Sequence, residues 1–209
     1  MRHLAVTLLL FLFSACGGNQ NSKQNGFVAE YGIWKTNEIE VCWENPSEED
    51  LGERKLVEET IQNTWSKHSP LKFTGWDTCS FRARGIRIRI KDTGASTAGL
   101  GKRLKGRKNG MVLNFTFQNW RPECQQKKEL CIRAIATHEF GHAIGFAHEQ
   151  NRHDTPETCQ IPSSGSKGTR AIGPWDIDSI MNYCNEDLLS GKLLSKGDIE
   201  ALQTIYGAN

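Results

Sequence analysis

Three histidines lie at fixed spacings in one short segment of the chain, residues 138–149, which reads HEFGHAIGFAHE. His138 and His142 are four residues apart, so a helix would project both imidazoles from the same face, where they can share one metal ion. Gly145 follows one turn later, where the chain can leave the helix through a backbone conformation that glycine adopts at little cost. Such a bend can return His148 to the same ion. The segment therefore predicts a metal site with three histidine ligands.

A glutamate beside the first histidine indicates what this metal site would do. Zinc held by three protein ligands and one water is the pattern of a catalytic site, whereas structural zinc is usually closed by four protein ligands. A zinc-bound water has a pKa near neutrality, and Glu139 stands where it can take the water proton and pass it to a leaving amine. An inactive relative would be free to lose this glutamate, which is present here. We therefore predict a zinc hydrolase and, among hydrolases, a peptidase.

The segment resembles the signature of the metzincin zinc endopeptidases, in which a methionine-containing turn follows farther along the chain. Residues 178–183, DSIMNY, are the candidate for this turn. The resemblance implies that Met181 forms an apolar floor beneath the three histidines. It also implies that Tyr183 binds zinc in the resting enzyme and then swings away to stabilise the oxyanion, as in the astacin and serralysin branches. Without the resemblance, Met181 would be ordinary core packing and Tyr183 a half-buried aromatic residue.

The remaining motifs favour an astacin-like enzyme in a minimal bacterial form. Glu149, Arg152 and Asp154 complete the pattern HExxRxD, which is similar to astacins, whereas residues 194–207 are closer to the last helix of matrixins. Matrixins, however, lack the zinc-binding tyrosine. The resemblance implies an α+β, metzincin-like fold: a twisted mixed N-terminal sheet with two long helices, then a smaller, loop-rich C-terminal subdomain that ends in a helix. A single domain of this kind fits the length of the chain.

One family role does not transfer directly to this chain. In astacins, the N-terminus created by zymogen cleavage is buried near the glutamate that corresponds to Glu149. We expect this chain to carry no comparable pro-segment, and Glu149 therefore to have another partner. Arg152, another basic group and a water molecule remain open as alternatives.

The N-terminal residues predict export. Arg2 and His3 precede an apolar run, residues 4–13, that is too short to span a bilayer as a permanent helix. Residues 13–17, FSACG, resemble a bacterial lipobox, which would make Cys16 the lipidated first residue of a cell-envelope lipoprotein held at a membrane. A plain secretory peptide is the alternative. We expect a signal peptide over residues 1–15, a flexible tether over 16–27, and the metzincin catalytic domain over 28–209.

Six cysteines remain when Cys16 is set aside, and an even number in an exported chain fits three disulfides. Fifteen connectivities are possible, and the sequence does not choose among them. Pairing cysteines that are consecutive along the chain gives Cys42–Cys79, Cys124–Cys131 and Cys159–Cys184, and this is our prediction. The last pair would steady the stretch between the zinc helix and the methionine turn.

Apolar periodicity predicts the elements around these motifs. Residues 86–90 (IRIRI) alternate apolar and charged side chains, which predicts a half-buried strand with both arginines facing solvent. Ser47 and Asp50 form a capping-box pattern ahead of a helix with one apolar stripe. The other predicted strands span residues 39–43, 71–76 and 111–117, the zinc helix spans 128–147, and a final helix begins at Ser195.

Charge leaves a second class of function open. The net charge of +2 implies no strong partner preference, but residues 102–108 read KRLKGRK. These residues could form a solvated loop, prefer acidic peptides or an anionic surface, or bind nucleic acid, although no aromatic residues interleave them for base stacking. They fall in the segment 93–109, where the family resemblance implies an edge strand that binds extended peptide.

Three functions therefore remain open: a surface-tethered or secreted endopeptidase, a zinc-bound but inactive peptide-binding module, and a basic surface interaction protein. The first is our prediction. We expect one zinc ion, protein or peptide substrates, no nucleic-acid partner and a monomeric chain.

Overall fold

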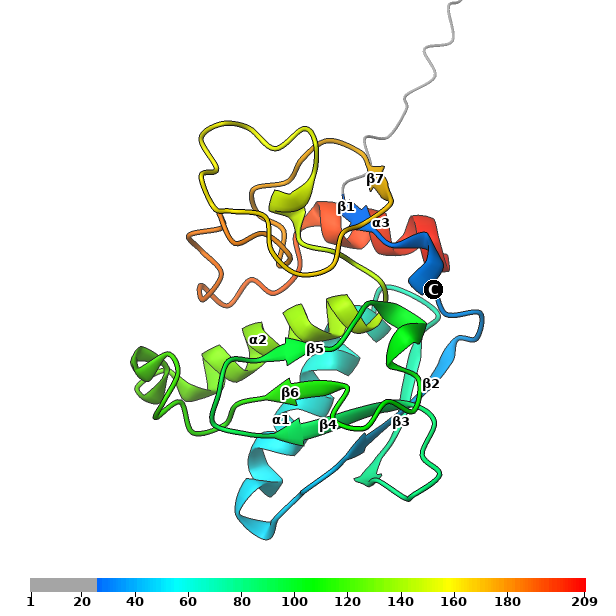
Figure 1. Cartoon of the computed structure of the whole chain (residues 1–209), viewed down its shortest axis with the longest axis vertical. Helices are drawn as coiled ribbons and strands as arrows, with labels where there is room; N and C mark the ends of the chain where they lie inside the picture. Colours follow the sequence, from blue (N-terminus) through cyan, green and yellow to red (C-terminus); the bar gives the residue numbers. More distant parts are fainter. Residues whose placement is uncertain (1–25) are drawn as a thin grey trace, which may run out of the picture.

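A five-stranded mixed sheet and two helices form the lower part of the molecule in Figure 1, and loops form most of the upper part. The computed structural model describes residues 26–209. The predicted signal peptide (1–15), the lipidation site Cys16 and the tether up to residue 25 lie outside the described residues. The mixed α+β class and its division into a sheet-bearing part and a loop-rich part agree with the sequence prediction.

The sheet has the strand order β3-β2-β4-β6-β5. β2, β3, β4 and β6 run parallel, and β5 pairs antiparallel with β6 at one edge of the sheet. The strands are β2 (Glu38–Trp43), β3 (Lys72–Thr78), β4 (Ile86–Ile90), β5 (Ser96–Thr97) and β6 (Met111–Leu113). The edge strand β5 thus falls inside the segment 93–109 in which a substrate-binding strand was expected.

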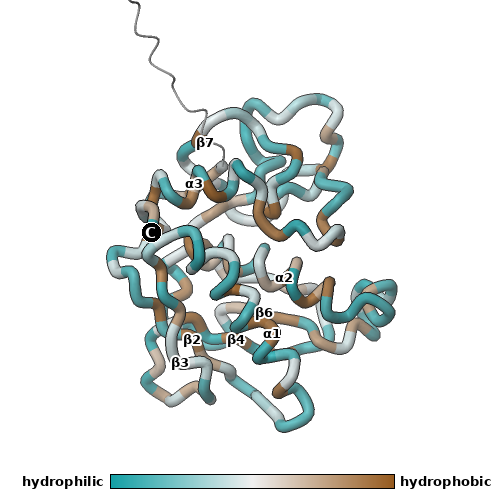
Figure 2. Tube along the Cα trace, turned by 180° about the vertical axis from the view of Figure 1, so that it is seen from behind, coloured by the Kyte–Doolittle hydropathy of each residue, from teal (hydrophilic) through white to brown (hydrophobic). Residues whose placement is uncertain are grey.

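Two helices pack together and share one hydrophobic core with the sheet. Figure 2 shows apolar segments, in brown, along these elements. α1 (Leu51–Ile61) follows the predicted capping box, in which Ser47 and Asp50 bond reciprocally. Its buried stripe continues through a wider π-helical turn (Gln62–Ser66) to Trp65, whose indole N–H donates to the Thr137 carbonyl of α2 (Lys128–Ala143) at 2.9 Å. The indole therefore fixes the position of α2, which carries the first two predicted metal ligands.

The upper part of the molecule is mostly irregular. It contains α3 (Lys196–Tyr206) and a two-stranded antiparallel sheet of β1 (Gly26–Val28) and β7 (Arg170–Ile172). In both parts of the molecule there are short 3-10 helices, which span Glu30–Gly32, Glu48–Asp50, Gly101–Leu104, Pro122–Gln125 and Glu149–Asn151. No helix within residues 26–209 has both the length and the apolar character needed to cross a bilayer.

The three predicted disulfides are all formed: Cys42–Cys79, Cys124–Cys131 and Cys159–Cys184. The predicted boundary between tether and domain is two residues too late, because Gly26 and Phe27 already belong to β1. The Phe27 carbonyl accepts a hydrogen bond from the amide of Ala147 at 2.7 Å. This backbone pairing makes the start of β1 part of the folded domain.

Two predicted elements end earlier than expected. The strand predicted over 111–117 stops at Leu113, because the Asn114 side chain accepts hydrogen bonds from the amides of Thr116 (3.0 Å) and Phe117 (2.9 Å) and turns the chain. The zinc helix predicted to end at residue 147 ends at Ala143, ahead of a glycine in the left-handed region. In both places a local turn overrides the apolar pattern.

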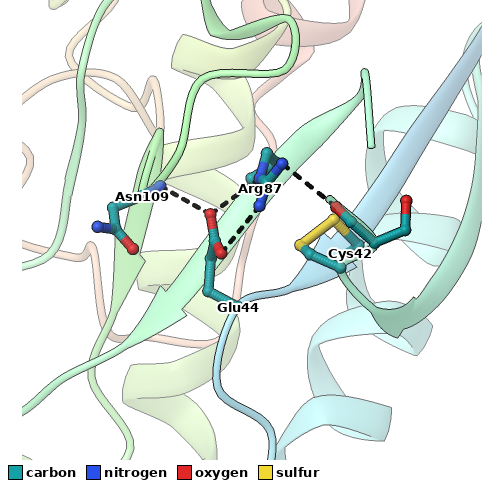
Figure 3. The surroundings of a disulfide bond; sticks show 6 residues. Cys42, Glu44, Arg87 and Asn109 are labelled. Carbon is teal, nitrogen blue, oxygen red and sulfur yellow. Dashed lines mark hydrogen bonds and ion pairs between the residues drawn. A yellow bond between two sulfur atoms is a disulfide. The ribbon is translucent and has the colours of Figure 1, made fainter. Parts of the chain in front are cut away.

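Arg87 in β4 is buried, although the alternating pattern predicted that it would face solvent. Its guanidinium binds both carboxylate oxygens of Glu44, at 2.9 and 3.1 Å, and donates to the Ser80 carbonyl at 3.4 Å (Figure 3). Glu44 also accepts from the Asn109 amide at 3.0 Å. Arg87 holds the pKa of Glu44 below its usual value. Two loops cover this face of β4, and the bidentate ion pair makes burial of the arginine possible.

Candidate metal centre

The three predicted histidine ligands converge on one point. His138 and His142 project from one face of α2, and Gly145, with φ +104°, turns the chain so that His148 returns to them. Nε2 of His148 lies 3.2 Å from Nε2 of His138 and 3.0 Å from Nε2 of His142. All three side chains are buried. The structure therefore brings the three residues together as the spacing predicted.

The protonation pattern of these imidazoles identifies the cluster as a cation site. Each Nδ1 donates to a backbone carbonyl: His138 to Ile180 (2.8 Å), His142 to Phe146 (2.8 Å) and His148 to Ser164 (3.0 Å). A neutral imidazole that carries its proton on Nδ1 has only a lone pair on Nε2. Three lone pairs therefore face one another with no proton between them. This arrangement is repulsive unless a cation binds there, and it is how metal-binding histidines are normally oriented.

The distances and the electrostatics fit zinc. Nitrogen ligands about 2.0–2.1 Å from a tetrahedral zinc ion lie about 3.3 Å from one another, close to the separations in this cluster. Burial lowers the pKa of His138 to about 4 and lowers the pKa values of His142 and His148 as well. The imidazoles are therefore neutral at physiological pH, which is the form that binds a metal ion. Three ligands leave one coordination position for water or substrate.

Glu139 lies beside this cluster with one carboxylate oxygen unsatisfied. The side chain is 4% exposed, and its Oε2 has no hydrogen-bond partner among the described residues. Burial raises the pKa of Glu139 to about 8. A bound dication would oppose this shift because its charge favours the carboxylate. A buried carboxyl group without a protein partner has room to bond a water or substrate atom in the site.

Tyr183 and Met181 are both placed at the histidine cluster. The Tyr183 ring stacks on the His138 ring at a centroid distance of 5.3 Å and lies 4.4 Å from the His148 ring. Burial and the charge of Glu139 raise the pKa of the Tyr183 phenol, which therefore keeps its proton. Met181 is buried. A Cβ on Gly141, between the first two histidines, would lie 2.4 Å from the Met181 sulfur.

Glu149 has the arginine partner that was one of the predicted alternatives. Its Oε1 lies 3.4 Å from the Arg152 guanidinium and accepts from the Asp176 amide at 3.1 Å, while both side chains of the ion pair are 1% exposed. Arg152 also binds Asp154 through two contacts of 2.7 Å and donates to the Gly26 carbonyl at 2.7 Å. The HExxRxD residues thus connect the third ligand's segment to the β1–β7 sheet. Burial raises the pKa of Glu149 to about 8 against the opposing effect of Arg152.

Two residues that orient the site were not identified from the sequence. Asp198 accepts from the Ser179 hydroxyl (2.6 Å) and the Ile180 amide (2.9 Å), and the Ile180 carbonyl in turn orients His138. In the sequence, Asp198 lies three residues after Ser195, a spacing typical of a local helix cap, and this spacing does not indicate the contact with the 178–183 turn. Gly141 is the second, since only a residue without a side chain lets Met181 reach the helix. In the sequence, the sign of this role is a glycine inside the predicted zinc helix, because glycine there costs about 1 kcal/mol relative to alanine and therefore needs a packing reason.

Two hollows meet at the cluster. The larger, of about 520 Å³, is lined by His138, Glu139 and Tyr183 together with Trp120 and Leu188. The smaller, of about 130 Å³, also reaches Glu139 and Tyr183 and is lined by both residues of the edge strand β5. Two hollows therefore reach the metal site, and the smaller one lies beside the edge strand β5. An extended chain can lie across such a site.

Comparisons with known proteins agree with this geometry. The family Astacin, a peptidase family, matches residues 28–165. "Astacin-like metalloprotease toxin 1" of Loxosceles intermedia and "Astacin-like metalloprotease toxin 5" of Loxosceles gaucho are each 41% identical over 59 residues, but the match spans only 22% and 32% of their lengths and 22% of this chain.

Two solved structures share the fold. Myroilysin superposes with a TM-score of 0.65 at 20% identity, over 88% of this chain and 100% of that one. High choriolytic enzyme 1, a hatching enzyme zinc-protease of the medaka fish Oryzias latipes, superposes with a TM-score of 0.54 at 20% identity, over 86% of this chain and 96% of the other. At this identity the likeness establishes the fold alone.

Replacing His148 with alanine should abolish stoichiometric zinc binding, because two imidazoles and water cannot hold the ion against dialysis as three imidazoles do. His153 is exposed and lies outside the cluster, so His153→Ala is the matched control and should retain one zinc per chain. Metal content after dialysis, measured by atomic emission, distinguishes the two variants. Equal zinc in both would contradict the assignment of His148 as a ligand.

Proposed function

The chain belongs to the astacin family, and we propose that it is a zinc-dependent endopeptidase that hydrolyses peptide bonds within proteins. The observation that supports this most directly is the combination at one point of three unprotonated Nε2 atoms and an unpartnered, buried glutamate. A structural zinc site would have a fourth protein ligand and would not need that glutamate. Membership of a peptidase family fits the same activity.

Glu139 is the general base in this proposal. Zinc, when bound by His138, His142 and His148, supplies Lewis-acid chemistry that polarises a carbonyl and makes water a nucleophile at neutral pH. The free Oε2 of Glu139 accepts the proton of the attacking water and then delivers it to the nitrogen of the leaving amine. The buried setting supports this role, because it raises the proton affinity of the carboxylate and excludes competing solvent.

Tyr183 stabilises the oxyanion in this proposal. Its ring lies against two of the histidines, its side chain is partly exposed to the site, and its phenol keeps its proton. The hydroxyl can therefore donate a hydrogen bond to the negative oxygen of a tetrahedral intermediate. A resting-state bond between the phenol oxygen and zinc remains an implication of the family resemblance.

The substrate in this proposal is an extended peptide that adds to the edge strand β5. Ser96 and Thr97 line the smaller hollow next to Glu139, and β5 is the last strand of its sheet. Main-chain hydrogen bonds to such an edge bind peptides with little dependence on their side chains. The larger hollow, with Trp120, Ile135 and Leu188, would receive a side chain on one side of the cleaved bond.

We also propose that the protein works outside the cytoplasm, anchored to a membrane through Cys16 or, alternatively, secreted. The lipobox-like residues 13–17 and the three disulfides support export. Mass spectrometry of the mature protein from its own cells tests the anchor, since diacylglycerol on an N-terminal Cys16 supports it and an unmodified N-terminus rules it out.

Glu139→Gln should lower kcat by about 10⁴-fold while zinc content is unchanged, because an amide cannot accept the water proton but fills the same space. Glu129→Gln changes an exposed glutamate at the start of the same helix and is the control. Turnover of a quenched fluorescent peptide and metal analysis are measured on the same samples. Activity close to that of the parent would remove the general-base assignment.

Tyr183→Phe should reduce kcat by about 10²-fold with little change in KM, since the missing hydroxyl would act only in the transition state. The control is Tyr31→Phe, because Tyr31 lies outside both hollows and its hydroxyl bonds the Lys167 carbonyl. Steady-state kinetics on one peptide provide both constants. An unchanged kcat would refute the oxyanion role, and a rise in KM alone would indicate that Tyr183 only binds substrate.

A further inference from the structure

One large apolar side chain in the described part of the molecule is almost fully exposed to water. Phe81, in the connection between β3 and β4 at the lower right of Figure 1, is 98% exposed, and Ile177 follows at 46%. Single exposed apolar residues are common on protein surfaces and need no explanation by themselves. Phe81 differs because its loop is fixed at both ends and because this loop and the loop bonded to it carry exposed cations.

The loop is fixed at both ends. The Cys42–Cys79 disulfide holds its start, and Arg87, itself bound to Glu44, donates to the Ser80 carbonyl directly before Phe81 (Figure 3). At the other end, Gly85 packs so closely on β2 that a Cβ there would lie 1.9 Å from the Glu40 carbonyl oxygen. The aromatic ring is thus presented to solvent by a constrained loop.

A second loop adds cations beside the first. The Gly106 amide donates to the Gly85 carbonyl at 2.9 Å, which joins the basic segment 102–108 to the Phe81 loop. The two loops expose seven cations, of which Arg103 lies over the Tyr31 ring. The five used here are Arg82, Arg84, Lys105, Arg107 and Lys108. Within residues 26–209 none of the five forms an ion pair. Arg107 donates to the Ala98 carbonyl at 2.6 Å, and the charge of Lys108 helps to lower the pKa of Glu44. Because no carboxylate pairs directly with any of the five, their charges can still attract an external anion.

We propose that Phe81 together with these five cations forms a surface that binds an anionic lipid bilayer, with the Phe81 ring entering the interface between headgroups and acyl chains. We name this set of six residues the Phe81 face. Lysine and arginine side chains near a membrane are attracted to anionic headgroups, and an apolar ring is stabilised when it leaves water for the interface. The protruding ring suits a deformable bilayer surface.

The same residues fit other polyanions less well. Binding to nucleic acid or to an acidic polysaccharide would use the cations but would leave the Phe81 ring in water. Single-stranded nucleic acid is held by several stacked aromatic side chains, and the Phe81 face has one. None of its six residues lines the two hollows that meet at Glu139. The cleft therefore stays open when this surface is occupied, and peptide hydrolysis is independent of the proposal.

Vesicle binding tests the proposal. The mature chain is produced from residue 16 onward with Cys16→Ser, so that neither an acyl chain nor the apolar run 4–13 is attached, and every variant carries this change. Sedimentation with vesicles of phosphatidylglycerol and phosphatidylcholine should show salt-sensitive binding that vesicles of phosphatidylcholine alone do not support. Phe81→Ser should weaken binding by about tenfold, and the double variant Arg84→Glu with Lys105→Glu by at least about thirtyfold.

Matched controls isolate the Phe81 face. Leu51→Ser removes another exposed apolar side chain, and the double variant Lys55→Glu with Lys67→Glu makes the same change of net charge elsewhere. These controls should bind vesicles as the parent does, and peptidase activity reports that every variant is folded. Absence of binding to anionic vesicles would overturn the proposal, as would equal weakening by the control variants.

Two further outcomes decide between lipid and polyanion. If Phe81→Ser binds vesicles as tightly as the parent, the ring does not enter the bilayer and the proposal fails. If the parent binds heparin or single-stranded DNA more tightly than anionic vesicles, without dependence on Phe81, the surface is a polyanion site instead. A Phe81→Trp variant whose added fluorescence is quenched by brominated lipid would support insertion directly.

Discussion

Three imidazole lone pairs that face one another govern how the C-terminal segments are arranged around the site. His138, His142 and His148 can hold this geometry only because each Nδ1 proton is bound by a carbonyl from a different segment. The Phe146 carbonyl, just after the glycine bend, binds His142. The Ile180 carbonyl of the 178–183 turn binds His138, and the Ser164 carbonyl binds His148. Such an arrangement is repulsive without a cation, so the backbone of the C-terminal part is organised to bind zinc.

The irregular C-terminal part has few helices or strands, and buried polar contacts provide its rigidity instead. Asp198 joins α3 to the 178–183 turn, and Arg152 joins the third ligand's segment to the β1–β7 sheet. The Cys159–Cys184 disulfide closes the loop between these two regions. Removing one partner of a buried charged network costs several kcal/mol, so these contacts restrain the loops that carry the site.

Spacing in the sequence predicted most of the site, because its key residues sit on one helix and one turn. His138 and His142 are four residues apart, which places both imidazoles on one helix face. The glycine after them ends the helix and returns His148 to the same point. Long-range partners were not predictable in this way. The burial of Arg87 depends on Glu44, which is distant in sequence, and the role of Asp198 depends on a turn that its own helix does not contain. β6 ends because the Asn114 side chain accepts hydrogen bonds from the amides that follow it, and the alternation of apolar residues gives no sign of this turn.

We propose that one bound zinc ion makes this chain a peptidase, and the decisive experiment is to measure whether cleavage depends on the metal. The purified, oxidised protein is incubated with an unbiased mixture of peptides before chelation, after chelation and after zinc is restored. We expect cleavage that disappears with the metal and returns at one zinc per chain. Stoichiometric zinc without any cleavage would contradict the enzymatic role, and absence of zinc binding would contradict the metal site itself.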